Sequence, residues 1–286
     1  MKSPIRVKKK ILIVSTVRNC EKNLFKIFRI FEAAFCDFET SYFFVESDST
    51  DNSVRELYQL RMLYGNVDFV SLGNVRDKFP SRPERIAYCR NVYLQYHAKK
   101  VKRNNVSYMV VADWDSVNFN LTREAVLSCW KRTNWDVCTA NQTFAYYDLW
   151  ALRCVNWVDF DCHARFESDL VFNGVAVAYF KNLVSPMFNK VKSNEWRETQ
   201  SSFGGLAIYK SQILLDARYS TSGGYTCEHV GFHDYLVRNG AKIYINGNFI
   251  NSSWTPNSLR SLMNFLGFLL FGKCFFKIRN TLVQKQ

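Results

Sequence analysis

Three short apolar segments, each followed by a polar stretch, set the pattern of the first part of the chain. The segments Lys10–Ser15, Tyr42–Val45 and Tyr108–Ala112 are rich in β-branched and aromatic residues, which is typical of buried strands. Between them, Leu24–Phe31 and Ser53–Tyr64 carry apolar residues at helical spacing. Alternating strands and helices predict a mostly parallel sheet flanked by helices on both faces, which is an α/β fold.

Acidic residues follow two of the predicted strands. Asp113 and Asp115 come directly after the third strand, and Glu46 and Asp48 come after the second. Ligands of open α/β sheets bind beyond the carboxyl ends of the strands, and carboxylate oxygens are the ligands that Mg²⁺ or Mn²⁺ prefers. The pattern indicates a polar site at this sheet edge, although an Asp-x-Asp pair on its own also occurs as a simple helix cap.

Glycine-rich nucleotide-binding motifs are absent from the sequence. No Gly-x-Gly-x-x-Gly follows the first strand, and no Gly-x-x-x-x-Gly-Lys-Ser/Thr occurs anywhere. Their absence argues against a dinucleotide-binding fold and against a P-loop.

Three motifs carry a resemblance to a known family. They are the turn at Thr16, Arg18 and Asn19, the string Glu-Ser-Asp-Ser-Thr-Asp-Asn-Ser at 46–53, and Ala-Asp-Trp-Asp at 112–115. They resemble the nucleotide-sugar glycosyltransferases of the GT-A fold, most of all the fungal capsule-associated and mannan-polymerase mannosyltransferases and their bacterial or viral relatives. The resemblance implies a Rossmann-like GT-A domain at 1–256, with a nucleotide-binding half at about 10–118 and an acceptor half at about 119–256.

By this resemblance, one nucleotide-diphospho-sugar and one metal ion, Mn²⁺ or Mg²⁺, share the carboxyl edge of the sheet. Asp115 would hold the metal on the diphosphate, and Asp113 would contact the ribose or the metal. The residues expected to line the nucleoside pocket are Thr16, Arg18, Glu46 and Asp48.

A basic helix is predicted to begin near Arg82, because Pro83 suits the first turn of a helix. Arg82, Arg85 and Arg90 follow close together in this segment. Guanidinium groups bind phosphate bidentately, and a helix N-terminus adds a favourable dipole. We therefore expect Arg85 to contact the donor, with an exposed basic helix that makes ordinary ion pairs as the alternative.

The second half of the chain is expected to bind the acceptor or the transferred sugar. An aromatic stretch at 144–153 includes Asp148, Trp150 and Arg153, and sugars bind to flat aromatic faces flanked by hydrogen-bonding groups. Gly204 and Gly205 precede an apolar strand-like segment, where glycine lets the backbone approach a ligand closely. Simple core packing of the aromatic residues and a plain tight turn at the glycines are the alternatives.

A predicted helix at 227–236 carries the last candidates. Glu228, near its start, is the candidate general base or acceptor-orienting carboxylate, because an inverting displacement needs a base near the acceptor hydroxyl. The mannosyltransferases that the chain resembles are retaining enzymes, so the stereochemical outcome stays open. His229 and His233 share one face of this helix, and His233 is a candidate metal ligand, with a structural histidine as the alternative.

The chain is strongly basic, with 38 Lys and Arg against 25 Asp and Glu and a net charge of +13. This balance favours contact with an anionic membrane surface. Nucleic acid is disfavoured because no zinc finger, helix-turn-helix or RNA-binding signature occurs. Nine scattered cysteines suit a reducing compartment, and Met1–Lys10 does not read as a signal peptide. We expect a cytoplasmic protein that is peripheral to a membrane.

Residues 257–286 form a basic and apolar tail. Leucine and phenylalanine are interspersed with Arg260, Lys273, Lys277 and Arg279, and the uninterrupted apolar stretch is shorter than the ~20 residues of a membrane-spanning helix. We expect an amphipathic helix on an anionic membrane surface. A buried C-terminal helix or a dimer contact is the alternative.

Together these features predict a metal-dependent glycosyltransferase of the hexosyltransferase class, active in surface polysaccharide synthesis. It would move a sugar from a nucleotide-diphospho-sugar to a saccharide or a lipid-linked saccharide. A sugar-phosphate nucleotidyltransferase is the first alternative, although Thr16–Asn23 lacks the glycine-rich loop of that class. A non-catalytic sugar-binding or membrane-binding scaffold is the second, and the presence of both Asp113 and Asp115 argues against it.

Overall fold

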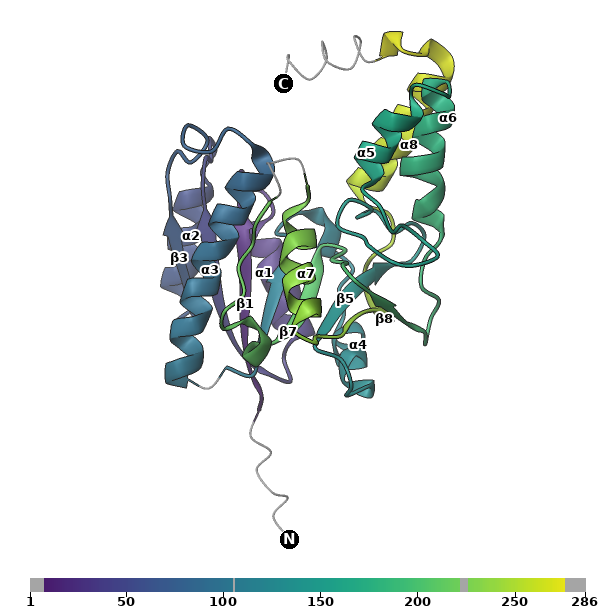
Figure 1. Cartoon of the computed structure of the whole chain (residues 1–286). Helices are drawn as coiled ribbons and strands as arrows, with labels where there is room; N and C mark the ends of the chain where they lie inside the picture. Colours follow the sequence, from purple (N-terminus) through teal and green to yellow (C-terminus); the bar gives the residue numbers. More distant parts are fainter. Residues whose placement is uncertain (1–7, 105, 222–225, 276–286) are drawn as a thin grey trace.

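The computed structural model describes residues 8–104, 106–221 and 226–275. A single eight-stranded sheet runs through this part of the chain in the order β3-β2-β1-β4-β7-β5-β8-β6 (Figure 1). The strands are β1 (Lys10–Val17), β2 (Glu39–Glu46), β3 (Val67–Ser71), β4 (Tyr108–Ala112), β5 (Val137–Gln142), β6 (Trp196–Thr199), β7 (Leu206–Lys210) and β8 (Ile243–Ser252).

Most of the sheet is parallel, and two strands run the other way. β1 pairs in parallel with β2 and with β4, β2 with β3, and β5 with β8. β7 is antiparallel to both β4 and β5, and the edge strand β6 is antiparallel to β8. The expected α/β fold with a mostly parallel sheet is confirmed.

Helices cover both faces of the sheet and also build a projection at one end (Figure 1). α1 (Leu24–Ala34), α2 (Ser53–Leu63) and α4 (Arg123–Ser128) pack on one face, and α3 (Arg82–Asn104) and α7 (Glu228–Arg238) pack on the other. α5 (Cys162–Asp169), α6 (Val175–Tyr179) and α8 (Pro256–Phe271) form the projection. The short helices are η1 (Ser116–Asn118), η2 (Cys129–Lys131), η3 (Phe180–Val184), η4 (Ser185–Phe188) and η5 (Ser211–Leu214).

Continuous apolar runs explain why the central strands are buried on both faces. In β1, Ile11 and Ile13 join the core on the α1 side, whereas Leu12 and Val14 join the core on the α3 side. Side chains of a strand alternate between faces, so a run without polar residues fits only between two helical layers. A third core lies under the projection and includes Phe166 of α5 and Phe268 of α8.

Strand connectivity places a crevice at the carboxyl end of β1. From β1 the chain builds β2 and β3 on one side, and α3 then carries it across to β4 on the other side. Open α/β sheets bind ligands where the strand order reverses in this way. The turns after β1, β2 and β4 therefore meet at one edge, as the positions of the acidic motifs predicted.

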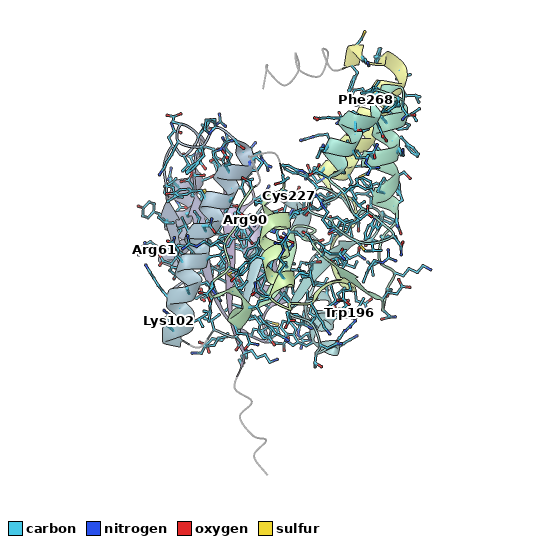
Figure 2. All side chains as sticks on the ribbon, viewed as in Figure 1. Arg61, Arg90, Lys102, Trp196, Cys227 and Phe268 are labelled. Carbon is cyan, nitrogen blue, oxygen red and sulfur yellow. The ribbon has the colours of Figure 1, made fainter. Side chains whose placement is uncertain are left out.

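The structure adds one strand to the sequence prediction and shows how the helix expected in the tail is packed. β3 was not expected, because Val67–Ser71 is short and its alternation of buried and half-exposed residues is a weak signal. Within the expected tail, α8 begins at Pro256, where Thr255 and Ser258 form a capping box. Phe268 of α8 is 1 % exposed and packs on Tyr179 with ring centroids 5.0 Å apart (Figure 2).

No helix in the described ranges is long and apolar enough to cross a membrane. Lys277 and Arg279, which were expected to flank the tail, lie outside the described residues.

Candidate active site

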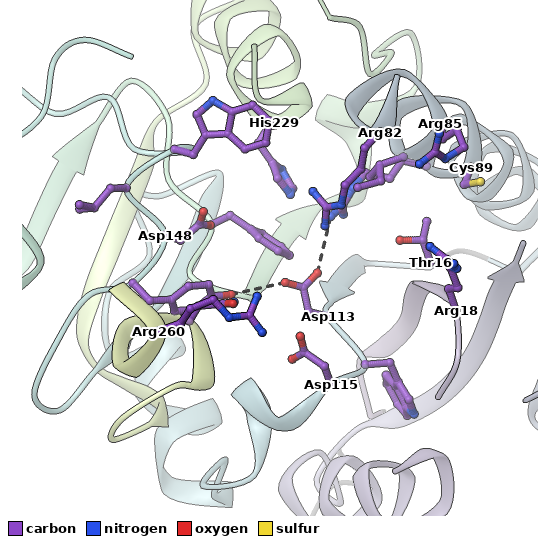
Figure 3. A pocket seen from close by; sticks show the side chains of 18 of the residues that line it. Thr16, Arg18, Arg82, Arg85, Cys89, Asp113, Asp115, Asp148, His229 and Arg260 are labelled. Atoms are coloured by element: carbon purple, nitrogen blue, oxygen red, sulfur yellow. Dashed lines mark hydrogen bonds and ion pairs between the residues drawn. The ribbon is translucent and has the colours of Figure 1, made fainter. Parts of the chain in front are cut away.

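A cavity of about 730 Å³ opens at the carboxyl ends of β1, β2 and β4. Its floor comes from the turns after these strands, and its walls come from α3, from the loop after β5 and from the projection (Figure 3). Lining residues include Thr16, Arg18, Ser47, Asp48, Arg82, Arg85, Cys89, Arg90, Asp113, Asp115, Tyr147, Asp148, Trp150, His163, Tyr179, His229, Asn257 and Arg260.

Five arginines line this cavity, and they come from three separate parts of the fold. Arg82, Arg85 and Arg90 come from α3, Arg18 from the turn after β1, and Arg260 from the second turn of α8. Figure 3 shows Arg82 and Arg85 on one wall and Arg260 on the opposite one. Within the described residues, the side chains of Arg82 and Arg260 have no ion-pair partner, so both charges are available to an anionic ligand.

Arg85 and Arg18 are partly held by the backbone. Arg85 Nη1 donates to the carbonyls of Phe79 and Pro80 at 2.8 and 2.6 Å, just before α3 begins. Arg18 Nε donates to the Asp48 carbonyl at 3.1 Å, which ties the turn after β1 to the turn after β2. These contacts fix where the two guanidinium groups lie without neutralising their charge.

Asp113 and Asp115 lie at the end of β4, on the cavity floor (Figure 3). The backbone around them is anchored: Asp113 N donates to the Gly205 carbonyl at 2.9 Å, and Asn118 Nδ2 donates to the Asp113 carbonyl at 2.7 Å. Asp115 Oδ1 accepts from Val117 N at 3.0 Å and so caps η1. Asp115 therefore does serve as a cap, and it also faces the cavity.

The negative charge on the floor is only partly balanced. Asp113 Oδ1 lies 3.6 Å from Arg90 Nη2, and Asp113 Oδ2 accepts from the Tyr147 hydroxyl at 3.4 Å. Burial and the charge of Asp115 raise the pKa of Asp113 to about 7, against the opposing effect of Arg90, and burial also raises the pKa of Asp115. A cation between the two carboxylates would relieve this repulsion.

The two aspartates fit a divalent cation that the substrate also coordinates. The described residues contain no cluster of three or more His, Cys, Asp or Glu side chains that could hold a metal ion. Mg²⁺ sites commonly use one or two protein carboxylates together with substrate phosphates and water. Asp113 and Asp115 supply two carboxylates of this kind, and the arginines of the cavity suit the phosphates of such a substrate.

Of the two acidic candidates at the end of β2, Asp48 lines the cavity and Glu46 lies behind it. Asp48 lines the cavity with a φ of 57°, and its Oδ1 accepts from Val75 N at 3.0 Å and from Arg76 N at 2.9 Å. Although burial opposes it, these hydrogen bonds lower the pKa of Asp48. Glu46 is 2 % exposed and accepts from Ser49 N at 3.0 Å, so it shapes the turn and does not line the cavity.

Of the residues expected on the acceptor side, some line the cavity and others do not. Asp148 and Trp150 line the cavity, whereas Gly204 and Gly205 lie behind it with φ of 65° and 79°. Gly204 N donates to Asp148 Oδ2 at 3.0 Å, and burial raises the pKa of Asp148 to about 6. Arg153 does not line the cavity, and its Nη2 lies 3.2 Å from Asp161 Oδ2 in an ion pair.

Glu228 lies behind the cavity wall and is joined to it by Arg90. Its side chain is 6 % exposed, and its Oε1 is 3.2 Å from Arg90 Nε, an ion pair without a directed hydrogen bond. Arg90 itself is sandwiched between the rings of Phe203 and Tyr219, with centroid distances of 5.2 and 5.5 Å. One buried guanidinium therefore connects Glu228 with Asp113.

The two histidines of α7 have opposite environments. His233 Nδ1 is hydrogen-bonded to the Ser201 hydroxyl and His233 Nε2 to the Tyr209 hydroxyl, at 2.9 Å each. His233 does not line the cavity. His229 lines the cavity, is 2 % exposed and stacks on Phe203, and neither ring nitrogen has a hydrogen-bond partner within the described residues. Burial, reinforced by the nearby Arg90 charge, lowers the pKa of His229 well below its ordinary value, so the ring is neutral.

Sequence reasoning did not assign roles to Tyr147 or His163, both of which line the cavity. Tyr147 stood in an aromatic run that fits core packing equally well. Arg90 was grouped with Arg82 and Arg85 in the basic helix, but its ion pairs with Asp113 and Glu228 were not expected. Arg260 was assigned to a membrane surface, since no local signal places the start of α8 beside β4.

No protein-family model and no curated protein matches the sequence. Solved structures with similar folds include the mannosyltransferase PcManGT from Pyrobaculum calidifontis in complex with GDP-Man and Mn²⁺, with a TM-score of 0.48 and 11% identity over 89% of this chain and 61% of that chain. A fragment of S. aureus TarS gives a TM-score of 0.45 and 12% identity over 90% of this chain and 64% of that one. The chain thus spans less than two thirds of the length of both proteins.

Proposed function

We propose that the protein is a metal-dependent glycosyltransferase that moves a sugar from a nucleotide-diphospho-sugar to a saccharide or lipid-linked saccharide acceptor. The observation that supports this best is that two aspartates share one cavity, at the carboxyl edge of the sheet, with arginines that have no ion-pair partner in the described part of the chain. A nucleoside diphosphate carries several negative charges on oxygen, and guanidinium groups together with a carboxylate-bound cation are the partners that such a group requires.

Asp115 and Asp113 would hold Mn²⁺ or Mg²⁺. When bound, the metal would neutralise the departing diphosphate. Arg82, Arg85 and Arg260 would bind the phosphate oxygens from both walls. Their positions are set before the ligand arrives, because α3 and α8 are each fixed to a separate core.

Thr16, Arg18 and Asp48 would contact the nucleoside, because they line the end of the cavity between β1 and β2. Glu46 would act indirectly, through the turn that presents Asp48. Tyr147 would orient Asp113 through its hydroxyl.

The acceptor hydroxyl would meet Asp148. This carboxylate lines the cavity, and a pKa of about 6 suits a group that accepts a proton near neutral pH. Glu228 is the second candidate for this role; its ion pair with Arg90 favours a positioning role, in which it holds the guanidinium beside Asp113.

His229 would hydrogen-bond to the transferred sugar or to the acceptor. A neutral imidazole can both donate and accept, which matches a hydroxyl group. A buried imidazole whose two nitrogens lack hydrogen-bond partners destabilises the ligand-free protein. A ligand that forms hydrogen bonds with these nitrogens would therefore bind more tightly.

The test is a thermal-shift screen of nucleoside diphosphates and nucleotide-sugars, each with and without Mn²⁺. We expect one nucleotide to raise the melting temperature in a Mn²⁺-dependent way, and Asp115→Ala to abolish that dependence. Asp216→Ala is the matched control, because Asp216 is exposed and does not line the cavity. If Asp115→Ala keeps the full Mn²⁺ response, the proposed metal site is wrong.

The reaction itself is tested by its products. Transfer to an acceptor releases a nucleoside diphosphate, whereas a nucleotidyltransferase that uses a sugar phosphate releases pyrophosphate. Mass spectrometry of the products separates these two enzyme classes.

A further inference from the structure

The large apolar side chains that face solvent gather on the projection. On α8 they are Leu259, Met263, Leu266, Leu269, Leu270 and Phe271, with exposed fractions between 48 and 73 %. Next to α8, the turn after α5 and the following helices add Val171, Phe172, Val177 and Phe180. Figure 1 shows that these segments, distant in sequence, lie side by side in the projection.

The outer face of α8 is apolar, whereas a helix face that is exposed to water is normally polar. Leu259, Met263, Leu266 and Leu270 follow one another at intervals of four, three and four residues, which places them in one stripe along the helix. The inner face is already used, because Phe268 packs on Tyr179 of α6. The exposed stripe is therefore a second apolar face with no partner within the described residues.

The two segments that carry this face have charge of a single sign. Residues 170–192 and 256–286 contain no Asp or Glu, although the chain has 25 of them elsewhere. The cations in the described part of these segments are Lys190, Lys192, Arg260, Lys273 and Lys181, and Lys181 pairs with Asp169 of α5 at 3.1 Å. A second copy of the chain that docked through the same face would bring like charges together, whereas an anionic lipid surface would complement them.

The same projection forms one wall of the cavity. Asn257, Arg260 and Ser261 from the first turns of α8 line it, as do Tyr179 and Leu183 from α6 and η3. A surface that received the apolar stripe would thus lie beside the cavity wall that carries Arg260.

We propose that the stripe on α8, together with the exposed apolar residues at 171–180, docks the protein on an anionic lipid bilayer. The apolar side chains enter the boundary between headgroups and acyl chains, and Lys273 lies at the level of the lipid phosphates. Binding then has an apolar part that salt does not screen and an ionic part that it does. This inference does not depend on the proposed enzymatic reaction.

The experiment is cosedimentation of the full chain with phosphatidylcholine vesicles, with and without phosphatidylglycerol. We expect binding to the anionic vesicles that weakens at high salt without vanishing. The double variant Leu266→Glu/Leu270→Glu should lower the affinity by about tenfold or more, because it removes two inserted side chains and adds two repelled charges. The control Met62→Glu/Leu63→Glu changes two residues of α2 that are 85 and 69 % exposed, against 53 and 73 % for Leu266 and Leu270, and it should bind as the original protein does.

The ionic part has its own pair of variants. Lys273→Glu should weaken binding to the anionic vesicles by several-fold, since a cation near such a surface contributes about 1 kcal/mol. Lys102→Glu, at the far end of α3 (Figure 2), should have no effect. If the Leu266→Glu/Leu270→Glu protein does not fold, Leu270→Gln, at a position 73 % exposed, carries the same test.

Two results would overturn the inference. One is failure of the intact protein to bind anionic vesicles at low salt. The other is a dimer in analytical ultracentrifugation that the Leu266→Glu/Leu270→Glu change converts to a monomer, which would assign the face to a second copy. The nucleotide thermal shift is measured on the same variants without lipid, so that loss of docking is distinguished from loss of the active site.

Discussion

At the residue scale, three carboxylates of the cavity repel one another, although five arginines also line it. Asp113, Asp115 and Asp148 all have raised pKa values, with burial as the main cause in each case. Such a group destabilises the ligand-free protein whenever it is ionised. Functional sites commonly include such destabilising groups, because carboxylates held close together bind a cation or a proton more tightly.

Asp148→Asn should stabilise the protein at alkaline pH and leave it unchanged in acid. The folded-state pKa of about 6 lies above the unfolded value of about 3.9, so the native state binds more protons between these values and stability falls as pH rises through that window. Removing the charge should therefore gain on the order of 2 kcal/mol at about pH 8 and nothing at about pH 4. Urea unfolding at several pH values, without divalent cations, measures this; an equal gain at every pH would contradict it.

Asp148→Asn should also lower turnover far more than Glu228→Gln does. A carboxylate that accepts the proton of the acceptor contributes about 10² or more, whereas glutamine in place of Glu228 keeps an oxygen beside the Arg90 guanidinium. Steady-state rates at saturating donor, combined with the melting temperature of each variant, separate chemistry from stability. The reverse order of effects would give the proton-accepting role to Glu228.

At the scale of elements, the glycine pair before β7 lies behind the cavity and packs against residues that support its floor. A Cβ on Gly205 would lie 2.6 Å from Val117 Cγ2 and 2.7 Å from the Tyr147 hydroxyl, at a φ of +79° that disfavours any side chain. Both neighbours support the aspartate motif: Val117 N binds Asp115, and Tyr147 binds Asp113.

Gly205→Ala should therefore destabilise the protein by about 2–3 kcal/mol and weaken its Mn²⁺ response. Gly65→Ala is the control, because no atom lies within 4 Å of the added Cβ. Denaturant unfolding gives the stability, and Mn²⁺ titration followed by melting temperature gives the response. A stable variant with an intact Mn²⁺ response would show that the backbone at Gly205 can adjust.

At the scale of the whole molecule, three cores hold the walls of the cavity in place. α3 belongs to one sheet face, β4 to the sheet, and α8 to the separate core under the projection. The distance between Arg82 and Arg260 is thus set by how the projection packs on the sheet, and not by any local contact between the two residues.

Phe268→Ala should loosen the projection and reduce nucleotide affinity together. Truncation of a fully buried phenylalanine costs about 3–5 kcal/mol, and α8 carries Arg260 on the same helix. The control Phe271→Ala, at a position 54 % exposed, should change stability by no more than about 0.5 kcal/mol in the absence of lipid. Denaturant unfolding and nucleotide thermal shift measure the two effects; loss of stability without loss of affinity would mean that Arg260 does not bind the ligand.

The sequence by itself determined the elements whose signals are local. The apolar runs of β1, β2 and β4, the helical spacing of α2, and the acidic residues at two strand ends each depend on a few neighbouring residues. Because parallel strands share a carboxyl edge, these local signals also indicated where Asp48, Asp113 and Asp115 would meet, and the family resemblance added Thr16 and Arg18.

Only the tertiary structure decided which of the remaining candidates reach the cavity. His229 and His233 are two histidines of one helix, yet His233 has hydrogen-bond partners for both ring nitrogens and His229 has none among the residues that the structure describes. Arg260 could be placed in the cavity only once the projection was seen to pack against the sheet. The physical reason is that the spacing of apolar residues shows which face of a helix or strand is buried. It does not show which other element covers that face, because this depends on contacts between residues far apart in the chain.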